Sequence, residues 1–316
     1  MSRKQRPETS DEADLHGVIV VDKPTGISSA KAVAKVKRTL NAKKVGHAGT
    51  LDPFAQGVLV CCVNHATRLA RFLLQGNKTY AATLKLGQET DTQDSTGSVV
   101  GVGNPAKLSE KTIESVFKQF VGSIEQLPPV YSALKHKGEP LYKLARRGQP
   151  LQKPPRRVQI SNIHIREINL PFIWFEVTCS AGTYIRTLCA DIGEALGCGG
   201  HLQALQRTES SGFTLKQAVT LKQLEQFTCA GDFAGLMINM ADALHDMPEY
   251  VAERHLIEKI RYGMVLTQKD LVSGHLADRI TDSQSYIKII DARNNLIAVL
   301  AYTQGKNRLN YCCVFN

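Results

Sequence analysis

A single aspartate, Asp52, ends a long basic stretch of the chain. Between Asp22 and Asp52 the sequence has no acidic residue and seven Lys and Arg residues. Asp52 is followed by Pro53 in a Gly-containing segment, and His47 stands five residues before it. Basic neighbours favour the ionised form of a carboxyl group and attract a polyanion. The pattern predicts either a carboxylate nucleophile that acts on nucleic acid or an ordinary turn aspartate before proline.

The segment around Asp52 has the form Gly-His-x-Gly-x-Leu-Asp-Pro-x-Ala-x-Gly-Val-Leu. This form resembles the catalytic loop of the TruB family of pseudouridine synthases. Four further blocks resemble family motifs, in the family's order and at similar spacing: 20–29, 78–97, 128–142 and 179–202. Together the blocks span about residues 16–225, so we identify the chain as a suspected member of this family.

The resemblance implies a catalytic role for three residues. Asp52 matches the family's essential carboxylate, and Arg186 matches the arginine that pairs with it. A surface arginine is the alternative for Arg186, but arginine favours the C-terminal end of a helix and this one stands at a helix start. Tyr80 matches the tyrosine that stacks on the target base and is proposed to take the C5 proton. Without the resemblance, core packing would explain Tyr80.

The resemblance also implies substrate contacts for His47, Tyr184 and Leu205. Tyr184 and Leu205 fall where the family's base pocket is lined, although Leu205 alone would be read as a core residue. His47 matches the histidine that fills the space left by flipped nucleotides, and by itself would be read as a loop hydrogen-bonding residue. Lys23 and Pro24 match a motif that supports the loop and are not expected to be catalytic.

The implied reaction converts the T-loop uridine at position 55 of tRNA into pseudouridine. The base must be flipped out of the folded RNA, and the isomerisation involves no redox change, so we expect no cofactor and no metal. One alternative is a guide-RNA-dependent synthase of the dyskerin kind. A non-catalytic tRNA-folding helper is another, and a phosphatase with an aspartate nucleophile is a third. The phosphatase would need a second nearby Asp and a Mg²⁺ site, which the loop lacks.

Charge and cysteine content indicate the partner and the compartment. The 316 residues carry a net charge of +10, and residues 135–157 contain eight Lys and Arg but one acidic residue, Glu139. We expect this segment to follow RNA phosphates, with a solvated surface as the alternative. The eight cysteines form no Cys-x-x-Cys pair, and Cys198 and His201 make at most half a zinc site. We expect a cytoplasmic monomer with reduced thiols that binds the T-arm of tRNA and no membrane.

The expected fold class is α+β: a mixed, largely antiparallel central sheet with flanking helices and a catalytic cleft, followed by a small β-rich unit that resembles a PUA domain. We expect a disordered tail over 1–14, a catalytic domain over 15–247 and an RNA-binding PUA-like domain over 248–316. Alternation and apolar spacing predict the following elements. Strands are expected at 16–21, 57–63, 78–86, 157–167, 173–180, 285–291, 295–302 and 309–315; helices at 28–40, 65–74, 109–120, 139–147 and 184–196; and a long loop at 88–107.

Overall fold

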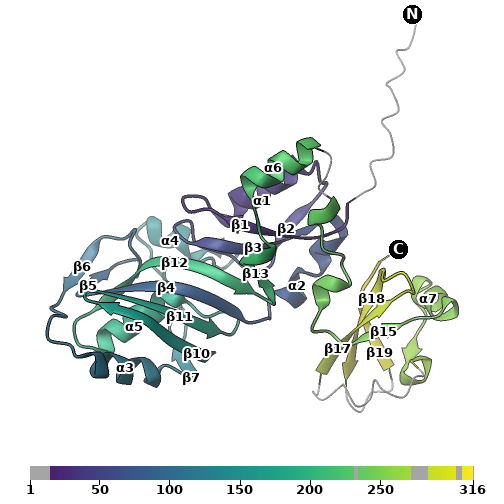
Figure 1. The fold of residues 1–316 in the computed structure, drawn as a ribbon. Coiled ribbons are helices and arrows are strands. Elements are labelled where there is room, and N and C mark those ends of the chain that lie inside the picture. Colours follow the sequence, from purple (N-terminus) through teal and green to yellow (C-terminus); the bar gives the residue numbers. More distant parts are fainter. Residues whose placement is uncertain (1–14, 231–233, 272–283, 304–307, 316) are drawn as a thin grey trace, which may run out of the picture.

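The computed structural model describes residues 15–230, 234–271, 284–303 and 308–315. Residues 1–14, for which a disordered tail was expected, lie outside the described residues. Two sheets dominate the fold, a large one to which most of the chain belongs and a smaller one near the C-terminus (Figure 1). The mixed α+β class expected from the sequence is confirmed.

The large sheet has ten strands in the order β14-β1-β3-β12-β4-β11-β10-β7, with β2 and β13 paired beside β3 and β12. Only two of its pairings are parallel, β1 with β14 and β3 with β12. The sheet is therefore mixed and largely antiparallel, as expected. The strands are β1 (Gly17–Lys23), β2 (Val45–His47), β3 (Gln56–Val63), β4 (Lys78–Leu86), β7 (Gly122–Gln126), β10 (Arg156–Asn169), β11 (Phe172–Cys179), β12 (Gly200–Ser210), β13 (Phe213–Thr214) and β14 (Val219–Thr220).

Helices cover the large sheet and add apolar faces to its core. The helices α3 (Glu110–Gln119) and α5 (Ile185–Ala195) pack on the buried face of β4, β10 and β11. Along β4 every second side chain is buried, which is the alternation that the sequence predicts for one face of a sheet. The helices α1 (Ser29–Thr39) and α6 (Leu221–Ala230) form a second core with β1 and β3. Ser28 caps α1 as expected, since its hydroxyl accepts a hydrogen bond from the Lys31 N–H.

Two expected elements differ from the structure. Residues 65–74 are not one helix but a 3₁₀ turn (Asn64–Arg68) followed by the short α2 (Ala70–Leu73), because the N–H groups of Leu69 and Phe72 bond to carbonyls three residues earlier. The expected loop over 88–107 contains a hairpin of β5 (Gln88–Thr90) and β6 (Val99–Val102). The side chains of Asp94 and Asp91 close the turn by accepting hydrogen bonds from the N–H groups of Thr96 and Ser98.

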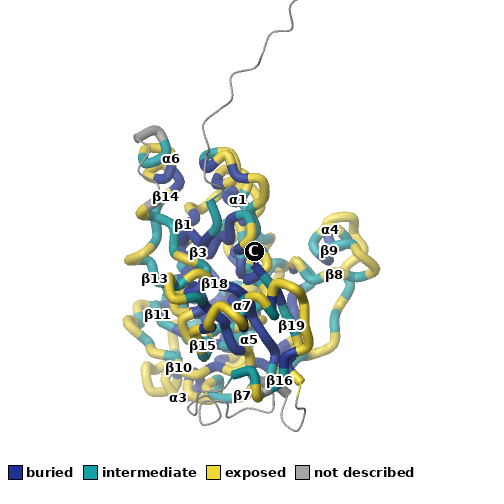
Figure 2. Tube along the Cα trace, turned by 90° about the vertical axis from the view of Figure 1, so that its right-hand side faces the viewer, coloured by how far each residue is buried: buried dark blue, intermediate teal, exposed yellow. Residues whose placement is uncertain are grey.

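Most of the basic segment, residues 135–155, forms a small lobe beside the large sheet, and its last two residues, Arg156 and Arg157, begin β10. It contains β8 (Lys135–His136), β9 (Glu139–Pro140) and α4 (Leu141–Arg146), and the two strands pair only with each other. Figure 2 shows this lobe projecting from the body, with exposed and intermediate residues along most of its trace, while β1 and β3 in the body are almost entirely buried.

The C-terminal sheet has five strands in the order β15-β17-β18-β19-β16, in agreement with the expected β-rich unit. With α7 (Arg254–Arg261) it encloses its own apolar cluster, but Leu296, Val299 and Phe315 pack in one cluster with Val18 and Val60 of the large sheet. The described residues include no helix that is long and apolar enough to span a membrane. The strands are β15 (Glu249–Val251), β16 (Leu266–Thr267), β17 (Gln284–Ile290), β18 (Leu296–Thr303) and β19 (Arg308–Val314).

Candidate active site

A cavity of about 350 Å³ opens at the middle of the large sheet. The loop that follows β2 forms one wall, the strands β4 and β12 form the floor, and the start of α5 forms the opposite wall. Five of the six residues singled out from the sequence line this cavity: Asp52, Tyr80, Tyr184, Arg186 and Leu205. The fold therefore brings together residues that are up to 153 positions apart in the chain.

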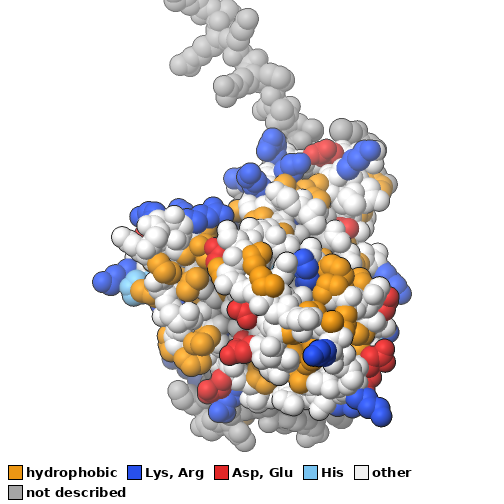
Figure 3. Space-filling model, turned by 90° about the vertical axis from the view of Figure 1, so that its left-hand side faces the viewer, with side chains coloured by type: hydrophobic (Ala, Val, Ile, Leu, Met, Phe, Trp, Pro, Cys, Tyr) orange, Lys and Arg blue, Asp and Glu red, His pale blue; other side chains and the backbone are white. Residues whose placement is uncertain are grey.

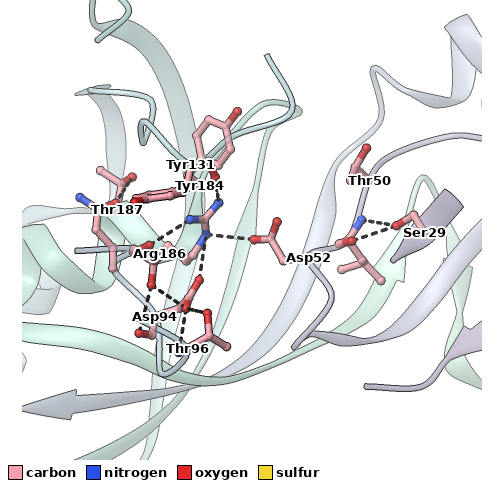
Figure 4. A network of polar contacts seen from close by, with 12 residues as sticks. Ser29, Thr50, Asp52, Asp94, Thr96, Tyr131, Tyr184, Arg186 and Thr187 are labelled. Atoms are coloured by element: carbon pink, nitrogen blue, oxygen red, sulfur yellow. Dashed lines mark hydrogen bonds and ion pairs between the residues drawn. The ribbon is translucent and has the colours of Figure 1, made fainter. Parts of the chain in front are cut away.

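Asp52 and Arg186 form an ion pair at the centre of the cavity (Figure 4). The Arg186 Nε lies 2.9 Å from Asp52 Oδ2, without the geometry of a linear hydrogen bond. The other two guanidinium nitrogens donate to the carbonyls of Thr92, at 2.9 Å, and Tyr131, at 2.8 Å. The Arg186 side chain is 4% exposed and that of Asp52 is 37% exposed. A fixed cation thus orients a carboxylate that remains open to the cavity.

Asp94 is a second carboxylate near Arg186 that the sequence analysis did not single out. Its Oδ2 lies 3.7 Å from Arg186 Nε, and the side chain is buried. Its Oδ1 accepts hydrogen bonds from the Thr92 hydroxyl at 2.8 Å and from the N–H and hydroxyl of Thr96 at 2.9 and 2.5 Å. Asp94 therefore approaches the same nitrogen of Arg186 as Asp52 does, from a different direction (Figure 4). Its sequence signals were its place in the block 78–97, which resembles a family motif, and in a polar loop of unusual length.

The loop that carries Asp52 is held from beneath by two buried side chains. The Ser29 hydroxyl donates to the Leu51 carbonyl at 2.9 Å and accepts from the Leu51 N–H at 2.8 Å. The Lys23 ammonium donates to the carbonyls of Pro24 and Ile27, both at 2.8 Å, and reaches that of Pro53 at 3.5 Å. Burial lowers the pKa of Lys23 to about 8, although the charge of Asp52 opposes this shift. These contacts are those expected of residues that support the loop.

Tyr80 and Leu205 lie on adjacent strands of the cavity floor. Tyr80 is on the buried face of β4, in register with Arg207 of β12 and Val177 of β11. Burial raises the pKa of its hydroxyl, and the positive charge of Arg207 opposes this. Leu205 on β12 stands opposite Ala82 of β4 and is nearly buried. The floor therefore presents one phenol and one aliphatic side chain, which suit a flat, uncharged ring.

Tyr184 is fixed at the residue that precedes α5. The Gln126 side chain accepts from the Tyr184 N–H at 2.8 Å and donates to its carbonyl at 3.0 Å. The Arg156 guanidinium lies over the Tyr184 ring, 4.7 Å from its centre, and also donates to the Gly182 carbonyl. Arg156 belongs to the basic segment, so this contact connects the segment to the cavity wall.

His47 is the one predicted residue that does not line the cavity. It lies on β2 opposite Cys61 of β3, two positions before Gly49, which does line the cavity. Its Nδ1 is buried without a hydrogen-bond partner. Burial, followed by the charge of Arg207, lowers the pKa of the imidazole. The neutral ring is thus favoured at physiological pH.

The suspected half zinc site consists of two separately bonded residues. His201 Nδ1 lies 2.9 Å from the Gln88 carbonyl, and the Cys198 thiol donates to the Gly199 carbonyl at 3.5 Å. Within the described ranges no group of three or more His, Cys, Asp or Glu residues could hold a metal ion.

Comparison with known proteins identifies the family. Residues 37–185 match the family model described as TruB family pseudouridylate synthase (N terminal domain), and residues 186–247 match that of the tRNA pseudouridylate synthase B C-terminal domain. The chain belongs to the TruB family. Similar relatives include tRNA pseudouridine synthase B of Syntrophotalea carbinolica, 40% identical over 93% of this chain and 94% of the relative. The protein of the same name from Bordetella pertussis is 50% identical over 67% of this chain and 87% of the relative.

Solved structures in the same family extend the likeness to the whole fold. This TruB-family chain is similar to a chain in the structure titled Cbf5-Nop10-Gar1 complex, with a TM-score of 0.73 and 28% identity over 95% of this chain and 84% of that chain. A chain from an H/ACA RNP bound to a substrate RNA gives a TM-score of 0.72 at 26% identity, over 95% and 85% of the two chains. Membership of the TruB family makes the chain an isomerase of the pseudouridine synthase class.

Proposed function

We propose that this chain converts the T-loop uridine at position 55 of tRNA into pseudouridine. Relatives named tRNA pseudouridine synthase B support tRNA as the substrate. The observation that carries the proposal is the Asp52–Arg186 ion pair. Both of its residues line the same cavity as Tyr80, Tyr184 and Leu205. A carboxylate, a phenol and apolar ring contacts are the groups that isomerisation of a uracil ring requires.

The reaction exchanges one bond of uracil for another. The bond from N1 to the sugar C1′ breaks, the base turns, and a bond from C5 to C1′ forms; C5 then loses its proton and N1 holds one instead. Since no electrons are gained or lost overall, the residues of the chain suffice and neither a cofactor nor a metal is needed. In this proposal Asp52 acts at the nucleotide, Arg186 orients it, and the hydroxyl of Tyr80 takes the C5 proton.

The target base enters the cavity only after it leaves the RNA stack. Tyr184 and Leu205 line the cavity and would contact the flipped base, whose packing there offsets the cost of unstacking. His47 lies outside the cavity, where it would fill the space that the flipped nucleotides leave in the loop. These roles are assigned from position, and each can be tested by substitution.

The RNA surface would combine the basic segment with the C-terminal unit. Lys and Arg side chains gather on the lobe of β8, β9 and α4, which projects at the left of Figure 3. Arg261 and Arg308 are exposed on the C-terminal unit, residues 248–316, which we propose as a PUA-like RNA-binding domain. Replacing both arginines by Gln should weaken binding of full tRNA but leave binding of an isolated T-arm unchanged.

A minimal reaction tests the proposal. The purified chain is incubated with an unmodified tRNA transcript and no other protein or cofactor, and pseudouridine is mapped along the RNA. We expect one product at position 55, and none when that uridine is replaced by cytidine. Activity from the isolated chain would also show that the reaction requires no partner protein or guide RNA. Absence of product from a folded protein that binds the tRNA would contradict the proposal.

A guide-dependent synthase is the second candidate, because the structural likeness to a chain of the Cbf5-Nop10-Gar1 complex is strong. The same assay separates the two. A guide-dependent enzyme would need added RNA and proteins, whereas the proposed one modifies tRNA alone. A tRNA-folding activity is compatible with either outcome, and the Asp52→Asn variant would retain it.

A further inference from the structure

Arg207 is a buried arginine in the cavity wall to which the family motifs quoted above assign no role. It lies on β12 and is 1% exposed. Its backbone stands between two strands of the site, in register with Tyr80 of β4 on one side and with Gly57 of β3 on the other. Arg207 therefore lies between the strand that carries Tyr80 and the strand that follows the Asp52 loop.

The guanidinium of Arg207 donates hydrogen bonds to three backbone carbonyls. Its Nε donates to Val58 at 2.8 Å, and its two terminal nitrogens donate to Gly49 at 3.0 Å and to Thr50 at 3.3 Å. Gly49 and Thr50 directly precede Leu51 and Asp52, so these bonds fix the entry of the catalytic loop. Arg207 forms no ion pair with a carboxylate of the described residues.

Two glycines show how closely the loop approaches Arg207. At Gly57, where φ is +105°, a Cβ would lie 2.2 Å from the Arg207 carbonyl oxygen. At Gly49, where φ is +121°, a Cβ would lie 3.4 Å from a terminal nitrogen of Arg207. A side chain at Gly57 would clash with the Arg207 backbone, and one at Gly49 would strain a backbone conformation that favours glycine. The chain therefore holds beside the catalytic loop a buried cation that is hydrogen-bonded to carbonyls but has no carboxylate partner among the described residues.

Tyr80 is the side chain beside this charge, because the two residues are in register on neighbouring antiparallel strands, where paired side chains share a face, and both line the cavity. Burial raises the pKa of the Tyr80 hydroxyl, and the charge of Arg207 is the largest influence in the opposite direction. A side-chain hydrogen bond from Arg207 lowers the pKa further, whereas Cys179 of β11 and the charge of Asp52 raise it. Among these groups Arg207 alone favours the ionised hydroxyl, the form that accepts a proton.

We propose that Arg207 is a positioning residue for the isomerisation: it fixes the loop that carries Asp52 and holds a positive charge beside the hydroxyl of Tyr80. The inference rests on the proposed function, since it assigns Arg207 to the same cavity and reaction. In this proposal one guanidinium influences both groups that act on the base: the Asp52 carboxylate through its loop, and the Tyr80 hydroxyl through its charge. Arg186 orients the Asp52 carboxylate directly, and Arg207 sets the position of the backbone that bears it.

Rates test the positional part. Arg207→Met removes the charge and the fork of hydrogen bonds, while Arg207→Lys keeps the charge but cannot bond three carbonyls in the same way. With unmodified tRNA in excess over its Kd, we expect the single-turnover rate to fall about 100-fold in Arg207→Met and about 10-fold in Arg207→Lys, with tRNA affinity unchanged. A folded Arg207→Lys variant within threefold of the wild-type rate would overturn the positional part.

An ionisation measurement on RNA-free protein tests the electrostatic part. Difluorotyrosine placed at position 80 ionises at lower pH than the other tyrosines, so its absorbance can be titrated by itself. We expect Arg207→Met to raise the pKa at position 80 by about one unit or more, and Arg207→Lys to restore most of the shift. Loss of structure alone would not give this pattern, because the conservative variant recovers the pKa without recovering the full rate.

Lys23→Met is the matched control. Lys23 is also a buried cation bonded to carbonyls beside the Asp52 loop, but it does not contribute to the pKa of Tyr80. We expect Lys23→Met to lower thermal stability and to leave the pKa at position 80 unchanged. An equal pKa shift in Lys23→Met and Arg207→Met, or no shift in a folded Arg207→Met, would overturn the electrostatic part.

If Arg207→Met does not fold, the pKa at position 80 in Arg207→Lys decides. A value within half a unit of wild type supports the role of the charge, and a larger rise overturns it. If the wild type forms no pseudouridine, the proposed function fails, and the titration still reports on Arg207.

Discussion

Cationic side chains surround the Asp52 loop and are frequent within the basic segment 135–157, but the two regions are built in opposite ways. Around the loop the cations are buried: Lys23, Arg186 and Arg207 are almost inaccessible and bond mainly to carbonyls. In the basic segment most of the Lys and Arg side chains are exposed, and the small strands β8 and β9 pair only with each other. The same residue types therefore serve two different purposes.

The difference shows that catalysis in this fold requires precisely placed cations, whereas RNA binding requires exposed ones. Chemistry on the base requires atoms placed to within a fraction of an ångström, which buried and fully bonded cations can secure. Contact with phosphates tolerates adjustment, because a phosphate attracts a mobile ammonium or guanidinium from many directions. Substitutions near the loop should therefore change the rate and not the affinity, whereas substitutions in the exposed segment should do the reverse.

Asp52→Asn should have the largest effect and act on the rate alone. The amide retains the shape of the side chain but loses the carboxylate, so product formation should fall by more than about 10⁴-fold. Affinity for tRNA should stay within a few-fold of wild type, since the phosphate contacts lie elsewhere. Single-turnover assays and a filter-binding titration measure the two. Turnover near the wild-type rate would remove Asp52 from its assigned role.

Tyr80→Phe should come next. The ring is kept and only the hydroxyl is lost, so the protein should fold and bind tRNA while the rate falls about 10²- to 10⁴-fold, the usual contribution of general acid–base catalysis. Near-normal turnover would show that stacking alone accounts for Tyr80. Thermal melting with and without tRNA serves as the control for folding and binding.

Neutralising the exposed segment should change affinity and not rate. Arg147 pairs with Glu139 and Arg156 contacts the cavity wall, which leaves six of the eight Lys and Arg residues. We choose four exposed ones among these six: Lys137, Lys143, Arg146 and Arg157. Replacing all four by Gln should flatten the slope of log affinity against log salt by about 3, since each phosphate that the protein neutralises adds about 0.7–0.9 to that slope. The rate at saturating tRNA should be unchanged.

The same number of charges can be removed elsewhere as a control. Helix α1 exposes Lys31, Lys35, Lys37 and Arg38, and their replacement by Gln changes net charge by the same amount. If both quadruple variants flatten the salt slope equally, net charge and not the basic segment governs binding, and the contrast between the two regions fails.

Ser29→Ala should have the smallest effect of the four. It removes both hydrogen bonds to Leu51 and leaves a buried N–H and carbonyl unpaired, at a cost of about 1–3 kcal/mol in the free energy of unfolding. A slightly looser loop should slow the reaction about 10-fold. Ser28→Ala removes only the helix cap of α1 and should cost about 1 kcal/mol without slowing the reaction. Equal rates for the two variants would contradict the role assigned to Ser29.

Local patterns predicted much of the fold. The alternation in 78–86 gave the bounds and the buried face of β4, and the helix expected at 109–120 appears as α3 behind its Ser109 cap. The strand β12 was not predicted, because its sequence is rich in Gln, Glu, Ala and Arg, which favour a helix by propensity. Its conformation is imposed by pairing with β4 on one side and β3 on the other.

By itself the sequence determined the family, the α+β class and the prediction that Asp52 is the catalytic carboxylate, because these depend on residue types and on spacing along the chain. Only the tertiary structure decided that Asp94 and Arg207 belong to the site. Each acts through partners that are distant in sequence, Asp94 through Arg186 and Arg207 through Gly49 and Tyr80. Periodicity tells which face of a strand is buried, but the strand that lies beside it is chosen by long-range pairing. That pairing put the buried Arg207 in register with Tyr80.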